Sequence, residues 1–123
     1  MATLNSTEIG ILKVRWEKLL NRLEEVFGEH PDLQTIIFLI GVQELGSQET
    51  QFTKDQKMDL MHIATCRLLS QYGYYKFLGK DAEGWPQWEK ANEFPHLSLG
   101  EQEKMLRKAV LTYFETSGFI RAE

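Results

Sequence analysis

This sequence has only one cysteine, no long apolar run and no recognisable secretory pattern in its first residues. Cys66 is the only cysteine among 123 residues, so no disulfide can form within the chain, and a reducing compartment is expected. The longest apolar run covers residues 36–42, whereas a helix needs about 20 apolar residues to cross a bilayer. The first residues show no basic stretch followed by an apolar segment, the pattern of a secretory signal. We therefore expect a cytoplasmic protein without a membrane span.

A surplus of positive charge is also missing. The formal net charge is −4, whereas nucleic-acid-binding domains usually present a basic face. Residues 53–80 nevertheless contain five basic and two acidic side chains, a local net charge of +3. A helix followed by a hairpin in this stretch would match the order of the recognition helix and wing in a winged helix-turn-helix domain. The similarity concerns only the order of the elements. Asp55 and Asp59 interrupt the basic stretch, so nucleic-acid binding is the third of three functional alternatives.

The first predicted helix has the clearest pattern. Its apolar residues recur at spacings of three and four: Ile9, Leu12, Trp16, Leu19, Leu23 and Val26, with Leu20 and Phe27 widening the stripe. Asn5 followed by Glu8 fits a capping arrangement at the start of the helix. Gly28 and then Pro31 predict its end.

The second predicted helix begins after Asp32 and ends at Gly46. It is apolar on all sides, so a buried strand over residues 36–42 is the alternative. The cap at Asp32 and the terminal glycine favour the helix. A helix of this kind must be covered from several directions, and a partner subunit is one way to supply that cover.

The third and fourth helices are predicted from capping boxes. Thr53 with Gln56 opens a helix that runs to Tyr72 before Gly73. Ser98 with Glu101 opens another, which runs to about residue 116 before Gly118. On the third helix, the residues predicted to share the apolar side are Met61, Ala64, Thr65, Leu68 and Tyr72. A solvated side is predicted for Asp55, Asp59, Cys66 and Ser70.

Between these helices, the chain from about residue 74 to residue 90 predicts a β-hairpin. Half of the aromatic residues of the chain lie between Tyr72 and Phe94, and most of these are on the two predicted strands. Residues 81–84 have the composition of a turn that ends in glycine. Pro86 lacks an N–H and restricts its strand to an edge. Strand alternation puts Tyr75 and Phe77 on one face and Tyr74, Lys76 and Leu78 on the other.

The aromatic hairpin is the strongest candidate for a binding surface, because aromatic side chains are enriched at binding hot spots. Its competing interpretation is a small satellite core beneath the hairpin. The candidate binding residues are Tyr74, Tyr75, Trp85, Trp88 and His96.

Two weaker patterns suggest chemistry. Asp59, His62 and Cys66 are spaced so that His62 and Cys66 can meet on one helix face, where they could hold a metal ion or activate the thiol. No second cluster completes a tetrahedral site, so neither a metal site nor a catalytic residue is assigned. A di-metal site in a helical bundle would combine Glu44 with Glu-x-x-His pairs, which the sequence lacks. We expect Glu44 to lie near the exposed end of its helix.

No phosphate-binding loop, dinucleotide fingerprint or nucleophile elbow is present. The sequence therefore predicts a single, mainly α domain over residues 1–123: a four-helix, bundle-like fold with a small β-hairpin inserted between helices three and four. The leading functional hypothesis is a non-enzymatic protein-interaction module without cofactors, which forms a homodimer and has another, unidentified protein as a further candidate partner. A small-molecule-binding protein or enzyme using His62 and Cys66 is the second alternative.

Overall fold

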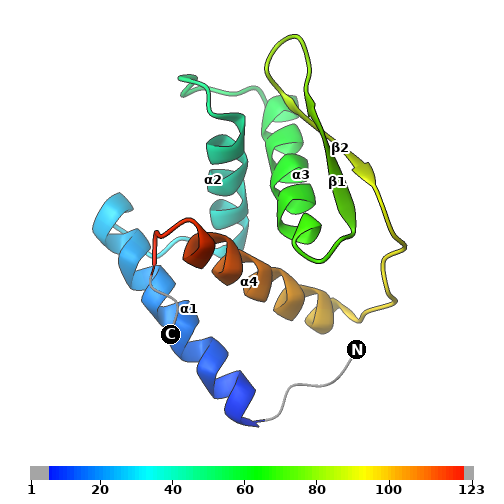
Figure 1. The fold of residues 1–123 in the computed structure, drawn as a ribbon. Helices are drawn as coiled ribbons and strands as arrows, with labels where there is room; N and C mark the ends of the chain where they lie inside the picture. Colours follow the sequence, from blue (N-terminus) through cyan, green and yellow to red (C-terminus); the bar gives the residue numbers. More distant parts are fainter. Residues whose placement is uncertain (1–5, 121–123) are drawn as a thin grey trace.

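The computed structural model describes residues 6–120. The order of its elements is α1 (Ser6–Phe27), α2 (Leu33–Leu45), α3 (Lys54–Ser70), β1 (Tyr75–Lys80), β2 (Pro86–Lys90) and α4 (Leu99–Thr116). The prediction of a mainly helical fold with a hairpin between the third and fourth helices is thus confirmed. In Figure 1, α2 and α3 run side by side, while α4 passes across their lower ends and α1 lies beyond it.

Caps fix most helix boundaries where the sequence predicts them. The Asp32 carboxylate accepts a hydrogen bond from the Thr35 N–H, which lowers the pKa of that carboxyl, and Gly46 ends α2 with a positive φ. The alternative of a strand over residues 36–42 is therefore wrong. Both predicted capping boxes are formed, at Thr53 and at Ser98. The predicted Asn5 cap lies outside the described residues, and α3 ends at Ser70, two residues earlier than expected.

The main core lies where the four helices meet. Its fully buried members include Leu19 and Leu23 of α1, Ile36 and Ile40 of α2, Ala64 and Leu68 of α3, and Ala109, Val110 and Leu111 of α4. Burial of this apolar surface is the main force that holds the helices together. A hydrogen bond also links the end of α3 to α4, because the Gln71 side-chain N–H donates to the Ala109 carbonyl at 3.0 Å.

Charged side chains strengthen the contact between α1 and α4. Arg15 donates two hydrogen bonds, of 3.0 and 2.6 Å, to the Glu115 carboxylate. Both side chains are shielded from solvent, which makes this bidentate pair stronger than an ordinary surface ion pair. The Arg107 guanidinium of α4 also lies 4.7 Å from the centre of the Trp16 ring.

Helices α2 and α3 approach each other most closely at Gly41. A methyl group built on Gly41 would stand 2.7 Å from the carbonyl carbon of Leu60, and closer still to its carbonyl oxygen. Because this neighbour is backbone rather than a flexible side chain, only glycine fits here without moving a helix. The glycine in the middle of α2 is therefore explained by helix packing.

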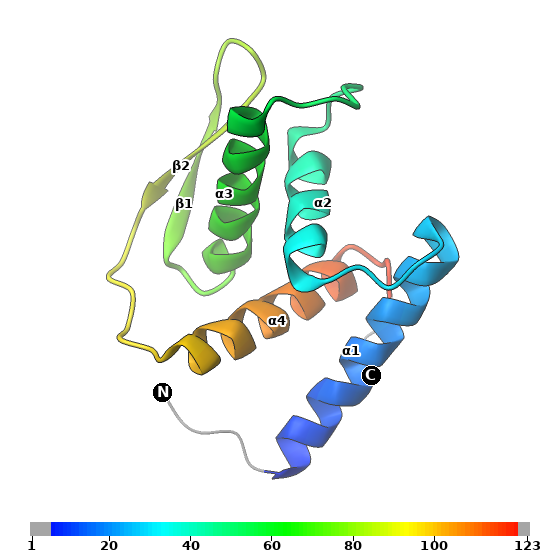
Figure 2. The ribbon, with the colours of Figure 1, turned by 180° about the vertical axis from the view of Figure 1, so that it is seen from behind.

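The hairpin packs along the side of α3 that faces away from α2, as Figures 1 and 2 show from opposite directions. Its two strands are antiparallel, with Phe77 opposite Trp88 and Lys80 opposite Pro86. The predicted turn is formed, because Asp81 accepts hydrogen bonds from the backbone N–H groups of Glu83 and Trp85. The register shifts between Phe77 and Gly79, where a β-bulge leaves one extra residue in β1.

Candidate functional site

The hairpin and α3 enclose a half-open cavity of about 430 Å³, here called the hairpin groove. This volume is within the range of small-ligand sites, about 300–1,000 Å³. The groove is lined by Glu44 of α2, Arg67 and Ser70 of α3, Tyr75, Phe77 and Lys80 of β1, and Pro86 and Trp88 of β2. Tyr75 and Phe77 both line it, as strand alternation predicts.

Aromatic rings form one wall of the hairpin groove. The centres of the Phe77 and Trp88 rings are 5.1 Å apart and the rings are tilted, a favourable aromatic pair. Phe77 keeps 49% of its surface exposed despite this contact. The Trp88 indole nitrogen is buried, and it has no hydrogen-bond acceptor in the part of the chain that the structure describes. This wall thus combines an open ring with an unsatisfied N–H donor.

A polar network forms the opposite side of the groove. The Tyr113 hydroxyl donates to Glu44 Oε2 at 2.7 Å, and Arg67 Nε lies 3.4 Å from Glu44 Oε1. The Arg67 guanidinium also lies 5.3 Å from the centre of the Tyr113 ring. Burial and the bond to Glu44 raise the pKa of Tyr113, which keeps its hydroxyl protonated and donating.

The expectation for Glu44 is confirmed for its position, in the last turn of α2, but is wrong for its exposure. Its side chain is only 24% exposed and has two partners, rather than lying free at a helix end. Arg67 reaches it from α3, which packs along α2, and the long Tyr113 side chain reaches it from α4. No sequence pattern indicates either contact, because each one joins residues far apart along the chain.

A second cavity, of about 440 Å³, lies between the start of α3 and the hairpin turn. Asp59, His62, Asp81, Glu83, Trp85 and Trp88 line it together with Gln56, Ile63, Pro86 and Gln87. Although three carboxylates and a histidine line it, no cluster of three or more metal-binding side chains exists among residues 6–120. Trp85 thus belongs to this cavity, and Trp88 lies between the two.

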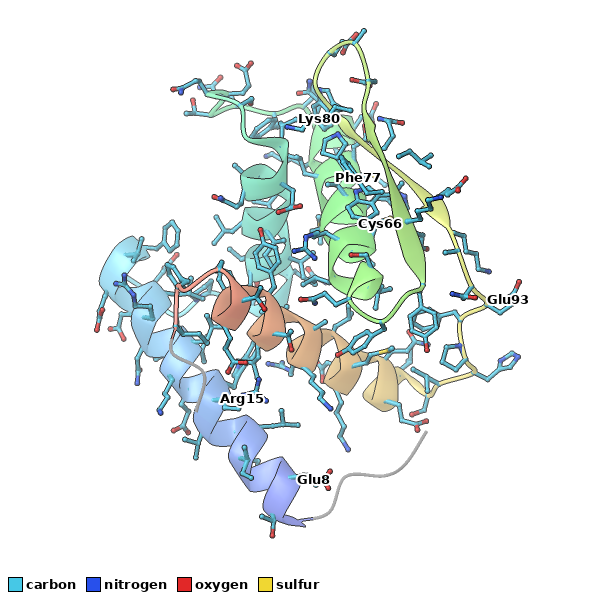
Figure 3. The ribbon with its side chains drawn as sticks, viewed as in Figure 1. Glu8, Arg15, Cys66, Phe77, Lys80 and Glu93 are labelled. Atoms are coloured by element: carbon cyan, nitrogen blue, oxygen red, sulfur yellow. The ribbon has the colours of Figure 1, made fainter. Side chains whose placement is uncertain are left out.

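Cys66 and His62 do meet, as their spacing predicts, with 3.5 Å between Sγ and Nε2. The predicted solvated position of Cys66 is wrong, because the hairpin covers that side of α3 and leaves the residue 0% exposed. Burial raises the pKa of the Cys66 thiol to about 11, so the thiol is protonated at neutral pH. Figure 3 places Cys66 on α3 beside the hairpin.

The remaining candidate residues lie outside both cavities. Tyr74 packs at the base of the hairpin, where its ring centre is 5.0 Å from that of Phe94 and 6.4 Å from that of Tyr72. His96 is exposed on the segment that leads to α4. The aromatic group is therefore divided between the hairpin groove, the second cavity and the hairpin base, rather than forming one surface.

Six of the eight residues that line the groove were absent from the candidate binding residues: Glu44, Arg67, Ser70, Phe77, Lys80 and Pro86. Arg67 and Lys80 are the two cations among them. Both belong to the stretch of net charge +3, which was the available signal. That stretch does not form one basic face: Arg67 pairs with Glu44, and Lys76 and Lys80 lie on opposite faces of the hairpin. Helix α3 is also covered by α2 on one side and by the hairpin on another, which leaves little of it for a DNA groove.

No known protein family matches this chain, and comparison with curated proteins and with solved structures found no match. Within the described part of the chain, none of the helices has the length and apolar character needed to cross a membrane. Function must therefore be argued from the geometry of the site.

Proposed function

We propose that this chain is a non-enzymatic protein-interaction module that self-associates, with the hairpin groove as its contact surface. The observation that carries the proposal is the exposure of Phe77, an aromatic side chain that remains half exposed in a groove built from four elements. Exposed aromatic side chains in partly enclosed sites are the usual anchors of protein interfaces. A second copy is the partner proposed, since one surface can then cover its own symmetry mate.

The contact is proposed to run through side chains rather than through a continuous sheet. Strand β1 carries Lys76 and Lys80 along its length. Lysines on an edge strand disfavour edge-to-edge pairing with a second copy. The aromatic wall of the groove has no comparable barrier.

The enzymatic alternative has less support. Its nucleophile would be Cys66, which is buried and protonated at neutral pH, whereas reactive cysteines are partly exposed and have a lowered pKa. A lone buried thiol instead supports the proposed reducing, cytoplasmic location.

Sedimentation of Phe77→Ala tests the proposal. Trp88 is a less suitable target, because it fills the space between the hairpin and α3 and its loss would disturb the fold. Leu78→Ala is the matched control: Leu78 is the next residue of β1 and is 55% exposed, but it does not line the groove. We expect a dimer for the unmodified chain and for Leu78→Ala.

For Phe77→Ala we expect association weakened by about 2 kcal/mol, the usual effect of truncating a central anchor. Circular dichroism of each variant must show the helical content of the parent chain. A parent chain that sediments as a monomer at high concentration would contradict the proposal. Equal weakening by the two substitutions would contradict the choice of the groove as contact surface.

A further inference from the structure

We propose that the hairpin groove is a binding site for a small aromatic carboxylate. This inference goes beyond the proposed function, since it assigns the groove a ligand and does not require a second copy of the chain. The groove has the volume of a small-ligand site, and it holds two cationic side chains together with an aromatic wall. A ligand that joins a ring to a negative charge matches both features.

Arg67 supplies the first anion-binding group. Its Nε faces Glu44 at 3.4 Å, and its guanidinium lies over the Tyr113 ring at 5.3 Å. These two contacts hold the guanidinium plane in place. Its two terminal nitrogens have no hydrogen-bond acceptor in the described part of the chain, and a guanidinium edge fits a carboxylate through two parallel hydrogen bonds.

Lys80 supplies the second group, and the β-bulge places it there. Strict alternation along β1 would put Lys80 on the face opposite Phe77. The extra residue between Phe77 and Gly79 reverses this order, so that Lys80 pairs with Pro86 and lines the same groove as Phe77. Gly79 permits the bulge, because its φ of +104° is strained for any other residue. Figure 3 shows Phe77 and Lys80 along the same strand beside α3.

The charge of the groove is unbalanced by one positive unit. Arg67 and Lys80 are its cations, and Glu44 is its only carboxylate. Glu44 already accepts from Tyr113 and pairs with Arg67, whereas Lys80 has no ion-pair partner among residues 6–120. One monovalent anion would neutralise the site, because it would balance the charge that Glu44 leaves uncompensated.

The aromatic wall supplies the remaining contacts. A ligand ring can pack on the exposed part of Phe77 beside Trp88, where tilted or offset stacking is favourable. The buried Trp88 N–H lacks an acceptor, and leaving such a donor unpaired is unfavourable. This nitrogen is itself buried, so the contact of a ligand with Trp88 is made by the part of the side chain that lines the groove.

Calorimetric titration with 1-naphthoate tests the proposal, with the neutral 1-naphthamide as the matched probe. We expect the carboxylate to bind and the amide to bind at least about tenfold more weakly, since charge-assisted hydrogen bonds are lost. Lys80→Gln is expected to weaken naphthoate binding by about tenfold. Lys76→Gln, which removes the same charge from the opposite face of the strand, should leave the affinity unchanged.

Indole N–H resonances locate the ligand independently. The chain has three tryptophans, at positions 16, 85 and 88, and naphthoate should shift the Trp88 signal but not that of Trp16. Absence of binding, equal affinity for acid and amide, or equal effects of the two lysine substitutions would overturn the proposal. Because a second copy and the ligand would both cover Phe77, the titration is run at a concentration where sedimentation shows a monomer. Absence of binding under that condition refutes only the ligand, whereas the sedimentation result at higher concentration tests only the proposed function.

Discussion

Gly41→Ala should destabilise this fold more than the same substitution at Gly10 or Gly100, the other two glycines within the described helices. The new methyl group would stand 2.7 Å from the Leu60 carbonyl carbon, well inside van der Waals contact. Neither helix can relieve this overlap by rotating a side chain, so α2 and α3 must separate and lose packing along their contact. Overpacking of this kind typically costs about 1–3 kcal/mol.

The higher helix propensity of alanine offsets part of this steric cost in the free energy of unfolding. Alanine favours a helix over glycine by about 0.8–1 kcal/mol. Gly10→Ala is the matched control, because Gly10 lies in α1 and no atom lies within 4 Å of the position of its new methyl group. We expect Gly10→Ala to stabilise the chain by about 0.5–1 kcal/mol and Gly41→Ala to destabilise it by about 2 kcal/mol.

Urea denaturation followed by circular dichroism measures both values, and the difference between the two variants isolates the steric cost. A net loss of about 2 kcal/mol is a large part of the 5–15 kcal/mol that stabilises a typical domain. If Gly41→Ala proved as stable as Gly10→Ala, the close approach of α2 and α3 at this position would be refuted.

Two further predictions concern the buried polar groups. Burial raises the pKa of Cys66 from 9.0 to about 11, so the unfolded chain loses this proton first and stability should fall as pH rises from 9 to about 11. Cys66→Ala should reduce that fall by about 2 kcal/mol or less, as measured by urea midpoints across this window. Tyr113→Phe should destabilise the chain by about 1 kcal/mol at neutral pH, because the half-buried Glu44 carboxylate loses its donor. A Glu44→Gln background should abolish most of that effect in a double-mutant cycle, and full additivity of the two substitutions would show that the hydrogen bond is not formed.

Local chemistry determined the elements of this protein. Asp32, Thr53 and Ser98 begin helices because their side chains accept hydrogen bonds from the first free N–H groups. The hairpin turn follows from Asp81 and the glycine three residues later, which is the chemistry that such a turn requires. These interactions join residues within four positions of each other, so the sequence contains all the information they need.

The candidate site could be predicted only in part, because it depends on contacts between distant residues. Periodicity separates an apolar side of α3 from a polar one, but it cannot show that the hairpin returns to cover Cys66. Strand alternation places Tyr75 and Phe77 together, but the bulge that brings Lys80 beside them changes the register by one residue.

Only the tertiary structure decided which groups face each other. Glu44, Arg67 and Tyr113 come from three helices and form one network, and Gly41 is needed only because α3 passes directly against it. Caps and turns act over a few residues, whereas the groove arises from packing among elements far apart along the chain. The sequence therefore determined which elements form, and packing decided which of their side chains meet.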